Sequence, residues 1–258
     1  MNNKEYLERL FDSDKSLIIY RVKDGFDIFT DFFKRFNLTT KNAKLFFNQT
    51  IKKRNSKNKF FDGYIGFLSY ELLCKLINVK IPKQNSNGFH KNIFYKPQTL
   101  IKIRKNIQVL SILKNYKKNK KLLLSGKKFF FEKKFKVNSS LSQYSKLFKN
   151  FSEKIRQGKT YQIKICQKYR NKSTIDPIEF FWNLMEVNCS SEAFVIRDKD
   201  YSIISCSPET LIEKKNNIIK TKPIAGTMQR KKNSTRLKAK KYFQQNEKES
   251  KEHNMIVD

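Results

Sequence analysis

The sequence has little glycine and proline and a single tryptophan: 7 Gly, 5 Pro and 1 Trp in 258 residues. It contains no apolar run of the roughly 18 residues that a membrane-spanning helix needs, so we expect no membrane span. Residues 1–20 carry acidic side chains early and lack a small-residue cleavage site, unlike a secretory signal. These absences predict a cytoplasmic protein.

Cysteine is also sparse. Its four occurrences, Cys74, Cys166, Cys189 and Cys206, show no CxxC spacing. That spacing is typical of zinc sites and redox motifs. We therefore expect reduced thiols, with neither a disulfide framework nor a zinc site.

Negative charge is scarce, with 23 acidic against 56 basic residues and a net charge of +33. Such an excess can bind nucleic acid, because basic groups release counterions from phosphate backbones. Here, however, the lysines are spread over the whole chain, in the composition that an AT-rich coding sequence would give. A nucleic-acid footprint should instead cluster on one face or motif. Nucleic-acid binding is therefore the alternative to an enzyme, and not the expected function.

Aromatic residues are plentiful, with 23 Phe and 11 Tyr. Disordered chains are poor in aromatics, so most of this chain should fold. We expect an N-terminal region over residues 1–115 and a basic connecting segment over 116–138. The better-patterned part, over 139–258, follows.

In the N-terminal region, residues 26–36 are predicted to form an amphipathic helix. Residues 61–77 are predicted to be a strand that turns into a helix. Gly63 and Gly66 lie close together there, which indicates a close approach of two backbones.

The later part alternates between helical and extended patterns. Apolar residues recur at helical spacing over 141–155, and Gly158 is a natural stop. Strict alternation of apolar and polar residues is typical of a half-buried strand. The patterns predict a strand over 161–169, a helix starting at Asp176-Pro177, hairpins over 193–206 and 210–222, and helix from about 234.

Two neighbouring segments could carry chemistry, and adjacent hairpin strands would bring them to the same end of a sheet. Glu209, just after a strand, could act as a general acid or base. The alternative for Glu209 is a carboxylate that caps a helix N-terminus. Gly226 and Thr227 could offer an N–H and a hydroxyl to an anionic ligand, although a Pro-x-x-Gly segment is often only a turn.

Near the end, Glu249 and Glu252 lie three residues apart, with His253 beside them. Two carboxylates at this spacing can hold Mg²⁺, which usually takes only one or two from protein. The alternative is a solvated helix face that also carries Lys248 and Lys251.

Four short motifs occur in order along the later part: YQIKICQKY (161–169), SCSPETL (205–211), TKPIAGTMQR (221–230) and KESKEHNMIVD (248–258). In this order they resemble the chorismate-binding enzymes. These include the first components of anthranilate synthase and aminodeoxychorismate synthase. The resemblance covers 141–258 well, and GYIGFLSYE (63–71) extends it into the first region.

The resemblance implies a role for each matching residue. Glu209 corresponds to a general acid/base near the departing hydroxyl, and Gly226 and Thr227 to contacts of a chorismate carboxylate. Glu252, with Glu249 as the second candidate, corresponds to a ligand of Mg²⁺, which would neutralise the ring carboxylate. The implied fold is α+β: two packed antiparallel β-sheets with outer helices and the site between them.

The branch of the family depends on conflicting residues. Ala225 stands where many aminodeoxychorismate synthases carry a lysine, and alanine there is the anthranilate-type pattern. Tyr161-Gln162 and Met255–Asp258 are more similar to the aminodeoxychorismate group, and Ser191–Ala193 replaces the Pro-Tyr-Met of the tryptophan pocket. The expected function is component I of aminodeoxychorismate synthase, which receives ammonia from a glutamine amidotransferase. Anthranilate synthase component I is the alternative.

The family's last motif normally runs on into an Arg-Asn-Asp segment, with a second metal glutamate beyond it. We therefore expect this sequence to hold only the first part of the catalytic domain. An incomplete fold of this kind should expose apolar surface. The isolated chain should be nearly inactive.

Overall fold

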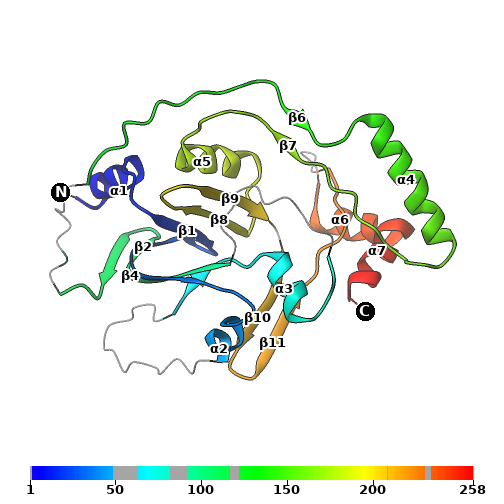
Figure 1. Ribbon diagram of the computed structural model, residues 1–258, viewed down its shortest axis with the longest axis horizontal. Coiled ribbons are helices and arrows are strands. Elements are labelled where there is room, and N and C mark those ends of the chain that lie inside the picture. The colour runs from blue at the N-terminus through cyan, green and yellow to red at the C-terminus, as the bar shows by residue number, and fades with distance from the viewer. Residues whose placement is uncertain are drawn as a thin grey trace. The chain divides into compact units, whose positions relative to one another are not determined.

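A computed structural model describes residues 2–48, 63–81, 92–114, 116, 122–207, 209–229 and 234–257. The chain divides into two compact units (Figure 1). One joins Met1–Ser125 to Pro177–Asp258, and the other is Gly126–Asp176. The first unit contains the main sheet and most of the candidate functional residues.

The first unit is built on a seven-stranded sheet whose strand pairs are all antiparallel. The order is β3-β4-β2-β1-β8-β9, and β5 also pairs with β4. Early and late strands meet in it, since Ile19 of β1 lies opposite Val195 of β8. The strands are β1 (Leu17–Val22), β2 (Gly25–Asn37), β3 (Ile65–Gly66), β4 (Ile93–Ile103), β5 (Ile107–Ser111), β8 (Glu192–Arg197) and β9 (Ser202–Ser207).

The helix predicted over 26–36 is wrong, because this segment is the long strand β2. Its phenylalanines recur at spacings that suit a helix, but β1 pairs with one edge of β2 and β4 with the other. Ile28, Phe29 and Thr30 are consecutive and all buried, as expected for a central strand covered on both faces. Tertiary pairing therefore overrides the local pattern.

Two helices cover one face of the sheet: α1 (Asn3–Asp12) and α5 (Pro177–Val187) (Figure 1). The start of α5 agrees with the helix predicted from Asp176-Pro177. Trp182 of α5 meets the ring of Phe26 edge-on, with centroids 4.9 Å apart. The core on this face consists of Tyr6, Leu7, Leu10, Leu17, Ile19, Ile28, Ile101, Ile178, Phe181, Met185, Ala193 and Val195.

A smaller cluster lies around α2 (Ala43–Asn48) and α3 (Tyr70–Leu76). The strand that turns into a helix is confirmed here, as β3 followed by α3. The close backbone approach at Gly66 is confirmed too, since a Cβ there would lie 2.0 Å from the carbonyl oxygen of Ile93. Residues 61 and 62 lie outside the described residues.

The second unit contains α4 (Leu141–Arg156) and a short ladder of β6 (Lys136–Val137) with β7 (Tyr169–Arg170). The helix predicted over 141–155 is confirmed. Ser140 and Gln143 form a reciprocal capping box at its start, and Gly158 (φ +69°) follows its end. The strand predicted over 161–169 is wrong except at Tyr169, because the described ladder is only two residues long. Alternation without a pairing edge does not make a strand.

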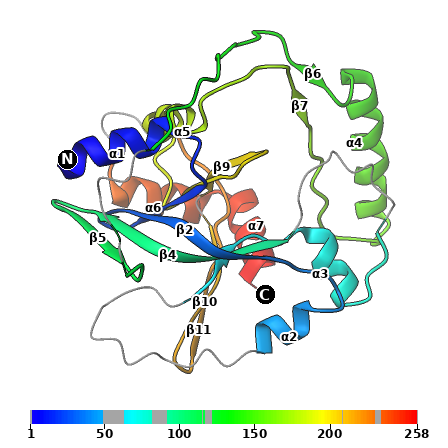
Figure 2. The ribbon, with the colours of Figure 1, turned by 60° about the vertical axis from the view of Figure 1, so that its left-hand side comes forward.

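Two further elements follow the main sheet. β10 (Thr210–Lys215) and β11 (Ile218–Lys222) form a separate two-stranded hairpin with Asn216 at positive φ, as predicted. It projects on the side away from α1 and α5 (Figure 1, Figure 2). The helix predicted from about 234 is two helices, α6 (Arg236–Gln245) and α7 (Glu247–Val257).

The antiparallel sheets and the helices confirm the predicted α+β class. No helix in the described part of the chain is long and apolar enough to cross a membrane. The four cysteines are free thiols. Placing the boundaries of the N-terminal region and the connecting segment at 115 and 138 stays a prediction.

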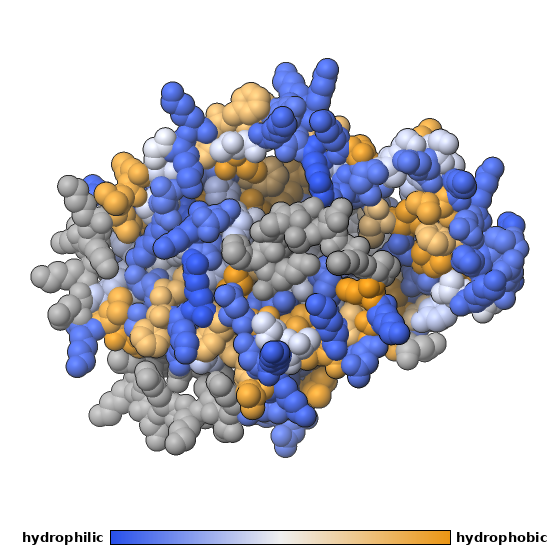
Figure 3. All heavy atoms as spheres, in the orientation of Figure 1, coloured by the Kyte–Doolittle hydropathy of each residue, from blue (hydrophilic) through white to orange (hydrophobic). Residues whose placement is uncertain are grey.

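Apolar side chains are exposed at many positions, and Figure 3 shows them scattered among hydrophilic ones on one face. On the hairpin, Leu211 is 78% exposed and Ile219 is 66% exposed. Scattered apolar residues are normal on a protein surface, so the apolar surface expected of an incomplete fold stays a prediction.

Candidate functional site

The turn that starts at Pro223 leaves the open end of the β10–β11 hairpin. Thr210 lies opposite Lys222 in the hairpin, so Glu209 and Pro223 continue from the same end. This is the juxtaposition that the sequence predicted. Glu209 is exposed and precedes a strand, so the interpretation of Glu209 as a helix N-terminal cap is wrong.

Gly226 brings this turn against α6 and α7. It has φ +81°, and a Cβ there would lie 2.2 Å from Glu249 Oε2 and 2.9 Å from Phe243 Cε1. Both the left-handed backbone and the lack of space therefore require glycine at this position.

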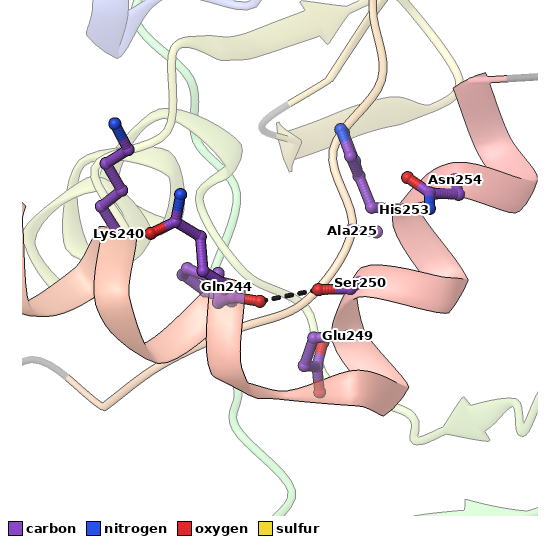
Figure 4. A pocket seen from close by; sticks show the side chains of 8 residues that line it. Ala225, Lys240, Gln244, Glu249, Ser250, His253 and Asn254 are labelled. Atoms are coloured by element: carbon purple, nitrogen blue, oxygen red, sulfur yellow. Dashed lines mark hydrogen bonds between the residues drawn. The ribbon is translucent and has the colours of Figure 1, made fainter.

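A cavity of about 410 Å³ lies beside Ala225, between the turn and the two helices. Figure 4 shows Lys240 and Gln244 projecting from one helix, and Glu249, Ser250 and His253 from the next. The hydroxyl of Ser250 donates to the carbonyl oxygen of Phe243 at 2.8 Å and ties α7 to α6. The lining residues are Ala225, Lys240, Phe243, Gln244, Glu249, Ser250, His253 and Asn254.

Glu249 has an unusual environment in this cavity. Its backbone N–H donates to Asn246 Oδ1 at 3.2 Å, and this bond helps to start α7 after the break between the helices. Its Oε2 atom is buried and has no hydrogen-bond partner among the described residues. An unpartnered buried oxygen costs about 1–3 kcal/mol, so a cation or a ligand donor at this atom would relieve that cost.

The structure therefore brings three of the six candidate residues together: Ala225, Gly226 and Glu249. Glu209 lies at the hairpin end from which their turn leaves. Thr227 is exposed and Glu252 is half-buried on α7, and neither is among the described lining residues.

No group of three or more His, Cys, Asp or Glu side chains in the described ranges could hold a metal ion. A site with only one or two carboxylate ligands would not form such a group. The unpartnered Oε2 of Glu249 suits Mg²⁺, which completes its shell with water and substrate oxygens. Glu249 therefore offers an oxygen for a metal ion at the cavity, whereas Glu252, three residues along the same helix, is not among the described lining residues.

Several lining residues carry no signal in the sequence. Lys240, Phe243 and Gln244 lie three and four residues apart, so they share one face of α6. That spacing was readable, but nothing in the sequence indicated that this face would meet the turn.

A second cluster lies where β1, β8 and β10 meet. The hydroxyl of Tyr20 donates to Glu192 Oε2 at 2.7 Å, and that of Thr210 donates to Oε1 at 2.6 Å. The Thr210 bond holds the pKa of the Glu192 carboxyl below its usual range, and Lys222 adds to this effect. Burial raises the pKa of Tyr20 to about 12, helped by the bond to Glu192.

The lowered pKa of Glu192 predicts acid sensitivity. Because the folded pKa lies below the unfolded value of 4.5, its stabilising contribution is present above pH 4.5 and lost as pH falls through the folded pKa. Between pH 7 and pH 3, the thermal midpoint of the wild type should fall further than that of Glu192→Gln. Parallel midpoint curves for the two proteins would contradict this.

A sequence profile described as chorismate binding enzyme matches residues 8–258. The chain belongs to the chorismate-binding enzyme family. The family suggested by the four motifs is therefore confirmed.

Named members of the family are similar over different lengths. Anthranilate synthase component 1 of Saccharolobus solfataricus is 26% identical over 221 residues, 81% of this chain and 49% of the relative. Its counterpart in Archaeoglobus fulgidus is 25% identical over 93% of this chain and 51% of the relative. Aminodeoxychorismate synthase component 1 of Bacillus subtilis is 32% identical over 116 residues, 45% of this chain and 25% of the relative.

A solved structure supports the fold. Anthranilate synthase component I from Streptococcus pneumoniae TIGR4 superposes with a TM-score of 0.63 at 19% identity, over 94% of this chain and 58% of that chain. The chain spans about half the length of the first curated relatives that it matches. The sequence profile thus shows the family, and the solved structure shows the fold. Neither identifies the reaction.

Proposed function

We propose that this chain is the chorismate-binding part of a component I that adds ammonia to chorismate. The observation that carries the proposal is the contact of the Gly226 turn with Glu249 beside the Ala225 cavity. The cavity volume of about 410 Å³ lies within the range of roughly 300–1,000 Å³ typical of small-molecule sites. Family membership supports the choice of substrate.

The residues have three proposed roles, which are carboxylate binding, proton donation and metal binding. The N–H of Gly226 and the hydroxyl of Thr227 would bind a substrate carboxylate. Glu209 would give a proton to the departing hydroxyl, because a protonated hydroxyl leaves as water. Glu249 and Glu252 would hold Mg²⁺, which supplies positive charge against a substrate carboxylate.

The ammonia would come from a glutamine amidotransferase, as the second component. This agrees with the names of the relatives, which are first components and so imply a partner.

Two products are possible for such a site. The first candidate is 4-amino-4-deoxychorismate, which the Tyr161-Gln162 and Met255–Asp258 segments favour. The second is anthranilate. It is favoured by Ala225 and by the relatives named anthranilate synthase component 1.

The test uses the purified full-length gene product with chorismate, Mg²⁺ and ammonium salt, with and without its amidotransferase component. Chorismate with Mg²⁺ should raise the thermal midpoint. The product identifies the branch, since anthranilate is fluorescent and 4-amino-4-deoxychorismate yields p-aminobenzoate with a lyase. Absence of both binding and product would refute the proposal.

Removing the acid of Glu209 tests its role. Glu209→Gln should lower turnover by about 10²–10⁴-fold while chorismate still binds, because general acid catalysis contributes about that much. Glu213→Gln is the matched control, since Glu213 lies on the same hairpin and its described ion pair, with Lys222, spans 3.7 Å at the surface. Equal turnover of the two variants would remove Glu209 from the mechanism.

A further inference from the structure

We propose that Glu192 is a positioning residue, whose carboxylate clamps Thr210 and so places Glu209 and the turn that begins at Pro223. The inference rests on the proposed function, because it assigns Glu209 a working position. The clamp itself is a set of hydrogen bonds, so it can be tested without measuring activity.

The clamp joins β1, early in the sequence, to β8 and β10, which come much later. Each oxygen of the Glu192 carboxylate accepts one hydroxyl: Oε2 from Tyr20 on β1 and Oε1 from Thr210 on β10. Hydrogen bonds to an ionised carboxylate are roughly twice as strong as those between neutral groups. The base of the hairpin is thus tied to the main sheet through one side chain.

The other side of Glu209 is anchored as well. The hydroxyl of Ser190 donates to the carbonyl oxygen of Ser207, at the end of β9. Arg21 Nη1 holds the carbonyl oxygen of Ser190 at 2.7 Å and so braces this anchor. Glu209 follows Ser207 by two residues and precedes Thr210 by one, which leaves it little freedom to move.

The hairpin needs such an anchor. β10 and β11 form a two-stranded sheet with no other described strand beside it, and isolated hairpins are marginally stable in water. The register also shifts between Thr210 and Glu213, which weakens the ladder just above the base. Without the bond from Thr210 to Glu192, the base of the hairpin would be held only by the pairing of Thr210 with Lys222.

The same clamp acts on the cavity. Lys222, opposite Thr210, is followed directly by Pro223, and Ala225 and Gly226 come next. A shift of the hairpin base therefore moves Glu209 and the cavity wall together. The Glu192 carboxylate thus fixes the positions of both Glu209 and the turn that begins at Pro223.

Two substitutions at Thr210 separate the clamp from side-chain volume. Thr210→Val keeps the shape but loses the hydroxyl, whereas Thr210→Ser keeps the hydroxyl. Amide hydrogen exchange over residues 207–211 should accelerate at least about fivefold in Thr210→Val, since a lost bond to a charged group corresponds to roughly that factor or more. Thr210→Ser should stay within about twofold of the wild type by the same reasoning.

The second readout is turnover with the amidotransferase component present. In Thr210→Val, kcat should fall by at least about tenfold, because misplacing a catalytic group by 1 Å can cost about 10²-fold. KM should rise as well, because the turn proposed to bind the substrate carboxylate moves with Glu209, and Thr210→Ser should restore both constants. Glu192→Gln, which keeps the size of the side chain but lacks its charge, should show the same pattern if Thr210→Val folds poorly.

Three outcomes overturn the clamp. The first is an unchanged rate of amide hydrogen exchange in both Thr210→Val and Glu192→Gln. The second is an equal change of exchange rate and kcat in Thr210→Val and Thr210→Ser. The third is a fall in kcat no larger than the fall in the fraction of folded protein. If the wild type neither binds nor converts chorismate, the proposed function fails. The exchange measurement then decides the clamp alone.

Discussion

Replacing Arg197 by methionine should lower the free energy of unfolding by about 3–5 kcal/mol, because it removes three hydrogen bonds from a buried cation to carbonyl oxygens. The Arg197 side chain lies in the core, with 7% of the residue exposed. Its guanidinium donates to the carbonyl oxygens of Phe11 at 2.6 Å, Leu10 at 2.8 Å and Lys15 at 3.1 Å. The cation thus satisfies the C-terminal end of α1, where helix carbonyls lack intrahelical partners.

Urea denaturation followed by circular dichroism measures this effect. Arg9→Met is the matched control, since Arg9 is an arginine of α1 itself that makes only an exposed i,i+4 pair with Glu5 at 3.1 Å among the described ion pairs. The control should lose less than about 0.5 kcal/mol. Arg197→Lys should lie between the two variants, because an ammonium keeps the charge but lacks the fork of donors. A loss in Arg197→Met no larger than in Arg9→Met would show that α1 does not depend on Arg197.

Replacing Gly226 by alanine should destabilise the turn and weaken chorismate binding. The positive φ alone costs an alanine about 1 kcal/mol. The added Cβ would also lie 2.2 Å from Glu249 Oε2, so either the turn or α7 must move. Because both elements line the Ala225 cavity, we expect affinity for chorismate with Mg²⁺ to fall at least about 100-fold, or by about 2.7 kcal/mol.

Gly158→Ala is the control for backbone strain. Gly158 has φ +69°, but nothing lies within 4 Å of its added Cβ. It should show the strain cost alone, with unchanged binding, in thermal unfolding and isothermal titration calorimetry. Glu249→Ala in the Gly226→Ala background should recover part of the stability, because it removes the overlapping carboxylate. Equal effects of the two glycine substitutions would show that the contact with Glu249 is unimportant.

Local signals in the sequence were sufficient for several elements. The capping box at Ser140 and Gln143 acts within a few residues, so α4 was predictable from its own segment. The hairpin around Asn216 and the close approach at Gly66 were predictable for the same reason. The four ordered motifs were enough to identify the family, because their order along the chain does not depend on folding.

Other features depend on which segments meet. Residues 26–36 became a strand since β1 and β4 supplied edges on both sides, whereas 161–169 lacked a long partner. The single helix expected near the end became two, because Asn246 both ends α6 and accepts a bond at the start of α7.

The family, the α+β class and the candidate residues Glu209, Gly226 and Glu249 could be recognised from the amino-acid sequence. The folded structure was needed to see that Glu249 lies against Gly226, that Lys240 lines the same cavity and that Glu192 joins β1 to β10. These contacts join residues that are distant along the chain. Glu192 lies 172 positions from Tyr20, and no local pattern encodes a hydrogen bond across that separation.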